Sequence, residues 1–314
     1  MVGNRDYRKA FPKASGDIFE ECENELLGLF KDMPSDSTDI MLNPDGTCHY
    51  ATSSGMSGKA IVSANEKTLR RIACVLASCS NQNLNENSPC ISCILPVSGY
   101  RAEILTPPVV DRISISIRIP NSDFHSLTSL VRKGMLDENQ ARVIRRFAIE
   151  RKNIAISGQT GSGKTTLLCA LANEIPANER IITIEDETRE ISIRHPNVVS
   201  IIAKKDVFSG RDAVKSALRM NPDRILYGET RDGQSAMELL KAFRTGHSGG
   251  MFTIHATSSS HVIRRLEDLL IEATATDGIK IIADSVDVAL HLDFDKNGRR
   301  YLREIKELNE TSSF

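Results

Sequence analysis

Aromatic residues are scarce in this sequence: tryptophan is absent, and only 5 of the 314 residues are tyrosine. This scarcity argues against a carbohydrate-binding or aromatic-cage protein, because such sites are built from aromatic faces. An excess of charge of one sign is also missing, since 40 Lys and Arg stand against 41 Asp and Glu, for a net charge of −1. These numbers exclude a general nucleic-acid-binding coat and a disordered polyampholyte.

Long hydrophobic runs are missing as well. No stretch approaches about 18 apolar residues, so we expect no transmembrane helix, and residues 1–21 lack the apolar centre of a signal peptide. Glycine (19) and proline (11) are too sparse for a collagen-like or low-complexity chain. These absences leave a globular protein that we expect in the cytoplasm.

The seven cysteines do not form a recognisable framework. An odd number spread over a long chain disfavours a disulfide scaffold. Cys90 and Cys93 have the spacing of a zinc-binding pair, but the apolar run around them predicts a strand, where positions three apart point to opposite faces. No second pair of this kind follows, so we reject a metal site there.

The length predicts about two domains, and the sequence pattern changes along the chain. Residues 1–120 combine helical periods with several strand candidates, which indicates a smaller α+β domain. Residues 121–145 are interpreted as a linker with helical patterns, in which Asp137 and Gln140 form a capping box. In residues 146–314, short apolar runs alternate with helical patterns, which predicts an α/β domain whose parallel sheet is covered on both faces.

A glycine-rich segment carries the most specific motif in the chain. It has the sequence GQTGSGKTT and matches GxxxxGK[ST], with a β-branched run before it and a helix-forming run after it. The glycines let several backbone N–H groups face one anion, and the positive end of the helix dipole adds to the attraction. We therefore predict a nucleoside triphosphate site formed by Gly158, Gln159, Thr160, Gly161, Ser162, Gly163, Lys164, Thr165 and Thr166.

Two side chains of this segment have specific tasks in sites of this kind. The Lys164 ammonium reaches the β- and γ-phosphates and so takes part in catalysis, and the Thr165 hydroxyl ligates Mg²⁺. The loop alone does not distinguish ATP from GTP, but no guanine-reading NKxD motif follows it. We therefore expect ATP and Mg²⁺ as the ligands.

Two acidic clusters follow the loop, each at the end of an apolar run. The first (ITIEDETRE) supplies Glu185, Asp186 and Glu190, and the second (DRILYGETR) supplies Glu229. The carboxyl ends of parallel strands meet at one edge of a sheet, where ligands bind. We predict that Glu185, Asp186 and Glu229 hold Mg²⁺ together with Thr165, partly through water. The spacing leaves the catalytic base open between Glu190 and Glu229.

A histidine-containing segment (TGHSGGMFTIHAT) covers residues 245–257. His255 comes directly after an apolar run, so it can approach the γ-phosphate and sense or stabilise it. His247 stands eight positions earlier among glycine-rich turns. No cysteine or third ligand accompanies the two histidines, so we reject zinc for this pair.

Taken in order, these segments resemble the four motifs of the secretion ATPase superfamily, which drives type II secretion, type IV secretion and type IV pili. Residues 158–166 are similar to its Walker A loop, 182–191 to its Asp box, 217–231 to its Walker B region and 245–257 to its His box. The resemblance covers about residues 90–290. The length and the sequence SALRMNPDRILYGETRD are most similar to the conjugative-transfer ATPases of type IV secretion systems, and the tetracysteine insertion of the type II enzymes is missing.

The resemblance implies an N-terminal domain joined to a RecA-like P-loop domain, assembled as a homohexamer with nucleotide at the junction of the two domains. It implies that Arg101 and Arg118 reach the phosphates and act in catalysis, with Arg112 as a weaker candidate, and that Arg265 acts across a subunit boundary. The expected partners are inner-membrane secretion or pilus components, with peripheral contact to the inner membrane and no direct sequence-specific nucleic-acid binding. Residues 1–90 do not match the superfamily closely.

The sequence therefore predicts a Mg²⁺-dependent ATPase motor that powers pilus assembly or substrate transfer in a conjugative type IV secretion system. A type IV pilus extension or retraction ATPase is an alternative within the superfamily. A non-hydrolysing nucleotide-dependent interaction protein is an alternative outside it. A RecA-like enzyme acting on DNA is disfavoured by the near-neutral charge and by the lack of a basic stretch interleaved with aromatics.

Overall fold

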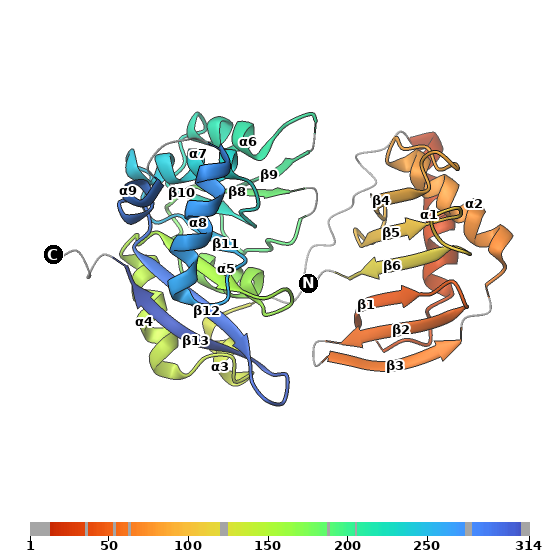
Figure 1. Ribbon diagram of the computed structural model, residues 1–314, viewed down its shortest axis with the longest axis horizontal. Helices are drawn as coiled ribbons and strands as arrows, with labels where there is room; N and C mark the ends of the chain where they lie inside the picture. The colour runs from red at the N-terminus through yellow and green to blue at the C-terminus, as the bar shows by residue number, and fades with distance from the viewer. Residues whose placement is uncertain are drawn as a thin grey trace. The chain divides into compact units, whose positions relative to one another are not determined.

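The computed structural model describes residues 13–34, 37–52, 55–61, 64–119, 125–186, 189–204, 206–273 and 278–308. The chain divides into two compact units, Met1–Asn121 and Ser122–Phe314, and each contains one large sheet (Figure 1). None of the described helices is long and apolar enough to cross a membrane. The predicted fold class, an α/β protein with an α+β domain at its N-terminus, is confirmed.

The first unit is an antiparallel sheet packed against two helices. Its elements are α1 (Lys13–Gly28), β1 (Ser37–Leu42), β2 (Thr47–Thr52), β3 (Gly55–Ile61), α2 (Glu66–Cys79), β4 (Cys90–Ile94), β5 (Arg101–Leu105) and β6 (Ser114–Arg118). The strand order is β3-β2-β1-β6-β5-β4, with every neighbour antiparallel. Leu26 of α1, Ile72 of α2 and alternate strand residues form one apolar core between the helices and the sheet.

Alternation along β5 and β6 brings two predicted site residues together in this unit. Ile115 and Ile117 of β6 are buried in the core, whereas Arg118 is exposed on the opposite face. Arg118 is the register partner of Arg101 in β5 on one side and of Asp39 in β1 on the other. The sheet of the first unit therefore presents Arg101 and Arg118 as cross-strand neighbours.

The second unit contains a seven-stranded sheet in which neighbouring strands are parallel, except for one antiparallel pair at an edge of the sheet. The strands are β7 (Ile154–Gly158), β8 (Ile181–Asp186), β9 (Val198–Ala203), β10 (Arg224–Tyr227), β11 (Met251–Ile254), β12 (Val288–Phe294) and β13 (Arg300–Glu307). Their order is β13-β12-β7-β11-β10-β8-β9, and β13 runs antiparallel to β12. The strand β7, which precedes the glycine-rich loop, therefore lies inside the sheet between β12 and β11.

Helices cover both faces of this sheet and create two apolar cores. The helices are α3 (Leu127–Arg132), α4 (Glu138–Ile149), α5 (Lys164–Ala172), α6 (Gly210–Leu218), α7 (Gly233–Arg244), α8 (Ser259–Ala273) and α9 (Gly278–Ala283). One core joins α3, α4 and α5 to the sheet, and the other joins α6, α7, α8 and α9 to its opposite face (Figure 1). Strands buried on both sides explain the short, uniformly apolar runs in the sequence.

The segment interpreted as a linker, 121–145, differs from that prediction where the structure describes it. Its helix α3 and the start of α4 belong to the second unit, because Leu130 and Ile144 are buried in the same core as Leu167. The predicted capping box at the start of α4 is confirmed: Asp137 accepts the N–H of Gln140 at 2.7 Å, and the Gln140 side chain accepts the N–H of Asp137. The apolar face of these helices thus completes a core rather than spanning a gap.

Candidate functional site

The glycine-rich loop lies at the carboxyl edge of the parallel strands, between β7 and α5. Gly161 and Gly163 adopt left-handed conformations, with φ of 77° and 95°, which side chains rarely tolerate. A Cβ on Gly158 would lie 2.6 Å from the carbonyl oxygen of Leu292 in β12, so this position leaves no room for a side chain. Gly163 is the N-cap of α5, and the loop therefore directs the positive end of that helix toward the edge of the sheet.

Lys164 is folded back over this loop. Lys164 is only 8% exposed, and its Nζ donates hydrogen bonds to the carbonyl oxygens of Gly158 (3.1 Å) and Gln159 (3.0 Å). Thr165 and Thr166 are half-buried in the first turn of α5, and Gln159 is exposed. The ammonium group of Lys164 is thus held against the backbone of the loop.

His255 and Glu229 continue from Lys164 as a chain of polar contacts. Nδ1 of His255 lies 3.5 Å from the Lys164 Nζ, and its Nε2 lies 2.9 Å from a carboxylate oxygen of Glu229. Arg231 in turn binds the other carboxylate oxygen of Glu229 at 2.8 Å. These contacts bring together three residues that the sequence predicted for the site, which come from α5 and from the ends of β10 and β11.

The charges in this chain set the protonation of its members. Burial and the neighbouring charge of Lys164 lower the pKa of His255, so the imidazole is neutral near pH 7. A neutral ring satisfies both contacts when Nε2–H donates to Glu229 and Nδ1 faces the ammonium. Burial acts to raise the pKa of Glu229, but the hydrogen bond and the charge of Arg231 outweigh it, so the net effect lowers that pKa and keeps the carboxylate ionised.

The acidic cluster at the end of β8 separates into three different environments. Glu185 is 3% exposed, and its Oε1 accepts the backbone N–H groups of Glu190 (2.6 Å) and Ile191 (2.7 Å). Burial raises the pKa of Glu185 to about 7. Asp186 is half-buried, with the Tyr227 hydroxyl 3.5 Å from its Oδ1, whereas Glu190 is exposed. Since β8 pairs with β10, this cluster lies on the strand next to the one that leads to Glu229.

Two contributors to this edge were not singled out from the sequence. Arg231 lies in the second acidic motif, and its pairing with Glu229 could have been suspected from their spacing. His291 of β12 is 2% exposed, and its Nδ1 lies 3.0 Å from the hydroxyl of Ser157, the residue before the glycine-rich loop. No sequence signal indicated this contact, because it depends on β12 pairing with β7.

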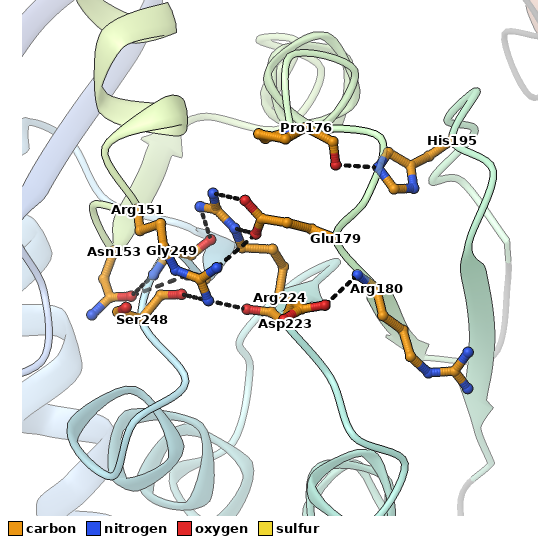
Figure 2. Close-up of polar contacts among 11 residues, drawn as sticks. Arg151, Asn153, Pro176, Glu179, Arg180, His195, Asp223, Arg224, Ser248 and Gly249 are labelled. Atoms are coloured by element: carbon orange, nitrogen blue, oxygen red, sulfur yellow. Dashed lines mark hydrogen bonds and ion pairs between the residues drawn. The ribbon is translucent and has the colours of Figure 1, made fainter.

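The opposite, amino edge of the sheet holds a buried cluster of ion pairs (Figure 2). Arg224, at the start of β10, is 0% exposed and binds both carboxylate oxygens of Glu179, at 2.6 and 3.0 Å. Arg151 donates to the same carboxylate at 2.8 Å and to the carbonyl oxygens of Asp223 and Ser248. The cluster ties the loop before β11 to the chain segments that precede β7, β8 and β10.

The histidine-containing segment, residues 245–257, runs from the amino edge of the sheet to its carboxyl edge, because it contains the strand β11. His247 precedes β11 at the amino edge, where Asn153 accepts the backbone N–H groups of Gly249 and Gly250 at 2.7 and 3.0 Å (Figure 2). His255 follows β11 at the carboxyl edge. Only the second histidine reaches Lys164, and a strand separates the two rings.

The residues at the carboxyl edge suit Mg²⁺ only in company with a phosphate ligand. Within the described residues, no group of three or more His, Cys, Asp and Glu side chains is arranged to hold a metal ion by itself. Mg²⁺ is commonly bound through one or two carboxylates, water and substrate phosphates. Thr165, Asp186 and Glu229 offer the hard oxygen donors for such a site. The Oε1 of Glu185 is occupied by two N–H groups, and its Oε2 is buried with no hydrogen-bond partner among the described residues.

A buried lysine on a glycine-rich loop, at the carboxyl edge of a parallel sheet, defines the class of P-loop nucleotide-binding proteins with a RecA-like core. Residues 49–293 match the family described as "Type II/IV secretion system protein", and the chain belongs to this family. The chain is accordingly a nucleotide-binding ATPase of the type II/IV secretion family.

Individual relatives and solved structures agree with this assignment. The chain is 38% identical to a probable conjugal transfer protein TrbB from Sinorhizobium fredii over 298 residues, which cover 93% of this chain and 89% of the relative. It is similar to the crystal structure of the VirB11 ATPase from Brucella suis, with a TM-score of 0.50 and 25% identity over 94% and 97% of the two chains. The ATPase DotB from Legionella pneumophila shares the fold, with a TM-score of 0.63 and 18% identity over 94% and 81%.

Proposed function

We propose that this ATPase is a Mg²⁺-dependent motor that powers pilus assembly or substrate transfer in a conjugative type IV secretion system. The observation that carries the proposal is the match over 93% of the chain to a relative named as a conjugal transfer protein. A match of that length includes both units and all four nucleotide motifs. A solved structure described as the pilus retraction motor PilT is also similar to this chain, but at 19% identity it supports the shared fold alone and does not favour the pilus alternative.

In the proposed reaction, the loop 158–163 and Lys164 hold the phosphates of ATP. Thr165, Asp186 and Glu229 would hold Mg²⁺, partly through water, and the ion would neutralise charge on the phosphates during cleavage. Glu229 is ionised and already fixed by His255 and Arg231, which suits a metal-holding carboxylate.

Glu190 is the candidate that we favour for the base. Its side chain is exposed in the segment that follows the end of β8 at Asp186, and no contact given for the described residues fixes its carboxylate elsewhere. A general base must be able to reach the attacking water, which an exposed carboxylate at this edge can do. Glu229, the other candidate, is engaged by His255 and Arg231. His255 would sense the γ-phosphate through its contact with Lys164.

The first unit would contribute Arg101 and Arg118 to the phosphates, since planar guanidinium groups recognise phosphate oxygens well.

We further propose that the protein forms a homohexamer in which Arg265 acts across subunits. The hexamer would lie on the cytoplasmic side of the inner membrane. Its partners would be inner-membrane secretion or pilus components. Light scattering with and without ATP tests the assembly, and a monomer under both conditions would contradict it.

The experiment that tests the proposed function combines turnover with transfer. Purified protein should hydrolyse ATP, and Lys164→Ala should abolish hydrolysis because the phosphates lose their fixed ammonium. Donor cells that lack the gene should lose conjugative transfer, and Lys164→Ala should not restore it. Transfer that is rescued by the Lys164→Ala variant would support the non-hydrolysing alternative. Normal transfer with altered pilus motility in the deletion strain would support the pilus motor instead.

A further inference from the structure

Glu185, the residue before the last one of β8, fixes backbone further along the chain. Its side chain is 3% exposed and uses one oxygen, Oε1, to accept two successive backbone N–H groups, those of Glu190 and Ile191, while Oε2 is buried with no hydrogen-bond partner among the described residues. The distances of 2.6 and 2.7 Å are short for N–H···O bonds, as expected when the acceptor is a carboxyl group. One side chain therefore fixes the backbone at the residue that carries the favoured catalytic base.

The residues packed around Glu185 leave space for its side chain and little room for another position. The neighbouring strand β10 ends at Tyr227, and the N–H of the next residue, Gly228, donates to the carbonyl oxygen of Ile184 at 2.8 Å. A Cβ on Gly228 would lie 3.1 Å from the Cγ of Glu185, so the glycine leaves the space that this side chain fills. Ile191 is 5% exposed and belongs to the apolar core of the unit. The anchor thus joins a core residue to an exposed one.

We propose that Glu185 is a positioning residue, which holds the backbone of Glu190 so that its carboxylate faces the reacting phosphate, and that it is not a Mg²⁺ ligand. The inference rests on the proposed function, because it takes Glu190 as the base. The proposed role depends on the two hydrogen bonds that Glu185 accepts from the N–H groups of Glu190 and Ile191. These bonds require an acceptor oxygen at this position, but they do not require that the side chain be charged. Misplacing a reacting group by about 1 Å can cost about 100-fold in rate.

The chain offers a conservative variant that separates the two roles. Glu185→Gln keeps an oxygen that can accept both N–H groups but is a poorer ligand for Mg²⁺, whereas Glu185→Ala removes the acceptor. We expect Glu185→Ala to lower kcat by about 10–100-fold with little change in the KM for ATP. Glu185→Gln should retain most of the wild-type kcat, and the Mg²⁺ concentration for half-maximal rate should not change in either variant.

Hydrogen–deuterium exchange of the full chain provides a readout that does not depend on activity. Exchange at the amides of Glu190 and Ile191 should accelerate in Glu185→Ala and remain slow in Glu185→Gln. Asp223→Ala is a matched control, because Asp223 accepts the backbone N–H of Arg180 at 2.6 Å at the amino edge of the same sheet (Figure 2). This control should expose the Arg180 amide and leave kcat unchanged.

Several outcomes would overturn the proposal. Equal losses of kcat in Glu185→Gln and Glu185→Ala, with slow amide exchange in both, would show that the acceptor is not what matters. An increased Mg²⁺ requirement in Glu185→Gln would instead assign Glu185 to the metal. The proposed base is tested separately with Glu190→Gln: if that variant remains active, the assignment of the base fails, while the exchange data still report whether Glu185 anchors the backbone.

Discussion

At the carboxyl edge of the second unit, Lys164, His255, Glu229 and Arg231 form an unbroken chain of polar contacts. One proton arrangement satisfies the chain, with the neutral His255 ring donating to Glu229 and facing the ammonium with its other nitrogen. The ring thereby fixes the separation between the group that binds phosphate and the carboxylate proposed for the metal. Its effect on turnover would come from orientation, since neither ring contact requires a charged imidazole.

Removing this ring should therefore slow hydrolysis more than it weakens nucleotide binding. We expect His255→Ala to lower kcat by about 10–100-fold, because Lys164 and Glu229 lose their common support, while the glycine-rich loop still binds the phosphates. Steady-state kinetics and calorimetric titration of ADP measure the two effects. His195→Ala is the matched control, since His195 bonds the Pro176 carbonyl near the amino edge (Figure 2). A wild-type kcat in His255→Ala would contradict the prediction.

His291 predicts a pH dependence of stability. Burial lowers its pKa, with charges of Arg303 and Lys164 acting in the same direction and Glu304 and Asp293 opposing them. Below a pH of about 6.5, the unfolded chain binds a proton at this histidine that the folded chain binds less readily. The free energy of unfolding should therefore fall as the pH drops below that value. Urea unfolding at several pH values measures the slope, which should be smaller in His291→Gln; an equal slope in that variant would contradict the assignment.

At the scale of elements, the carboxyl and amino edges of the parallel sheet differ in how their charged side chains are buried and paired. At the carboxyl edge, Lys164, His255 and Glu229 are linked by partly buried polar contacts of 3.5 and 2.9 Å. The amino edge holds Arg224 in a fully buried bidentate pair with Glu179, which Arg151 reinforces (Figure 2). Removing one partner of such a buried pair would leave the other charge buried and uncompensated.

Breaking this buried pair should cost far more stability than breaking an exposed one. In Glu179→Gln the Arg224 guanidinium stays buried without a carboxylate, and we expect a loss of about 3–5 kcal/mol of unfolding free energy. The control is Glu174→Gln, which breaks the pair between Glu174 and the 40% exposed Arg145 and should cost about 0–1 kcal/mol. Chemical unfolding measures both variants. Equal losses in the two would contradict the distinction between the edges.

The sequence predicted the elements of the site better than their surroundings. The strand, loop and helix around Lys164 and the capping box of Asp137 and Gln140 are local patterns, and both appear as predicted. The burial of Glu185 and the contact of His291 with Ser157 depend on pairing between strands distant in the chain, which leaves no local signal. The helices before β7 were interpreted as a linker for the same reason, since their partners in the core lie further along the chain.

At the scale of the whole molecule, the predicted site residues are divided between two units. The first unit places Arg101 and Arg118 opposite each other on neighbouring strands. Like charges in such a pair disfavour each other by a few tenths of a kcal/mol to about 1 kcal/mol. On its other side, Arg118 has the carboxylate residue Asp39 of β1 as its register partner. A structural role for the two arginines would make the loss of either one lower the stability of the first unit, whereas the proposed ligand-binding role would make it lower turnover.

The contrast between a ligand-binding and a structural role for Arg101 and Arg118 can be tested in the full chain. Arg101→Ala and Arg118→Ala should each lower ATP turnover strongly, by as much as about 10³-fold if the guanidinium stabilises charge on the transferred phosphate, without lowering the melting temperature of the first unit. Arg71→Ala is the matched control, because Arg71 is an exposed arginine paired with Glu25 in the same unit. Its turnover should stay near wild type. Full turnover in Arg101→Ala and Arg118→Ala, or an equal loss in Arg71→Ala, would remove the arginine pair from the proposed reaction.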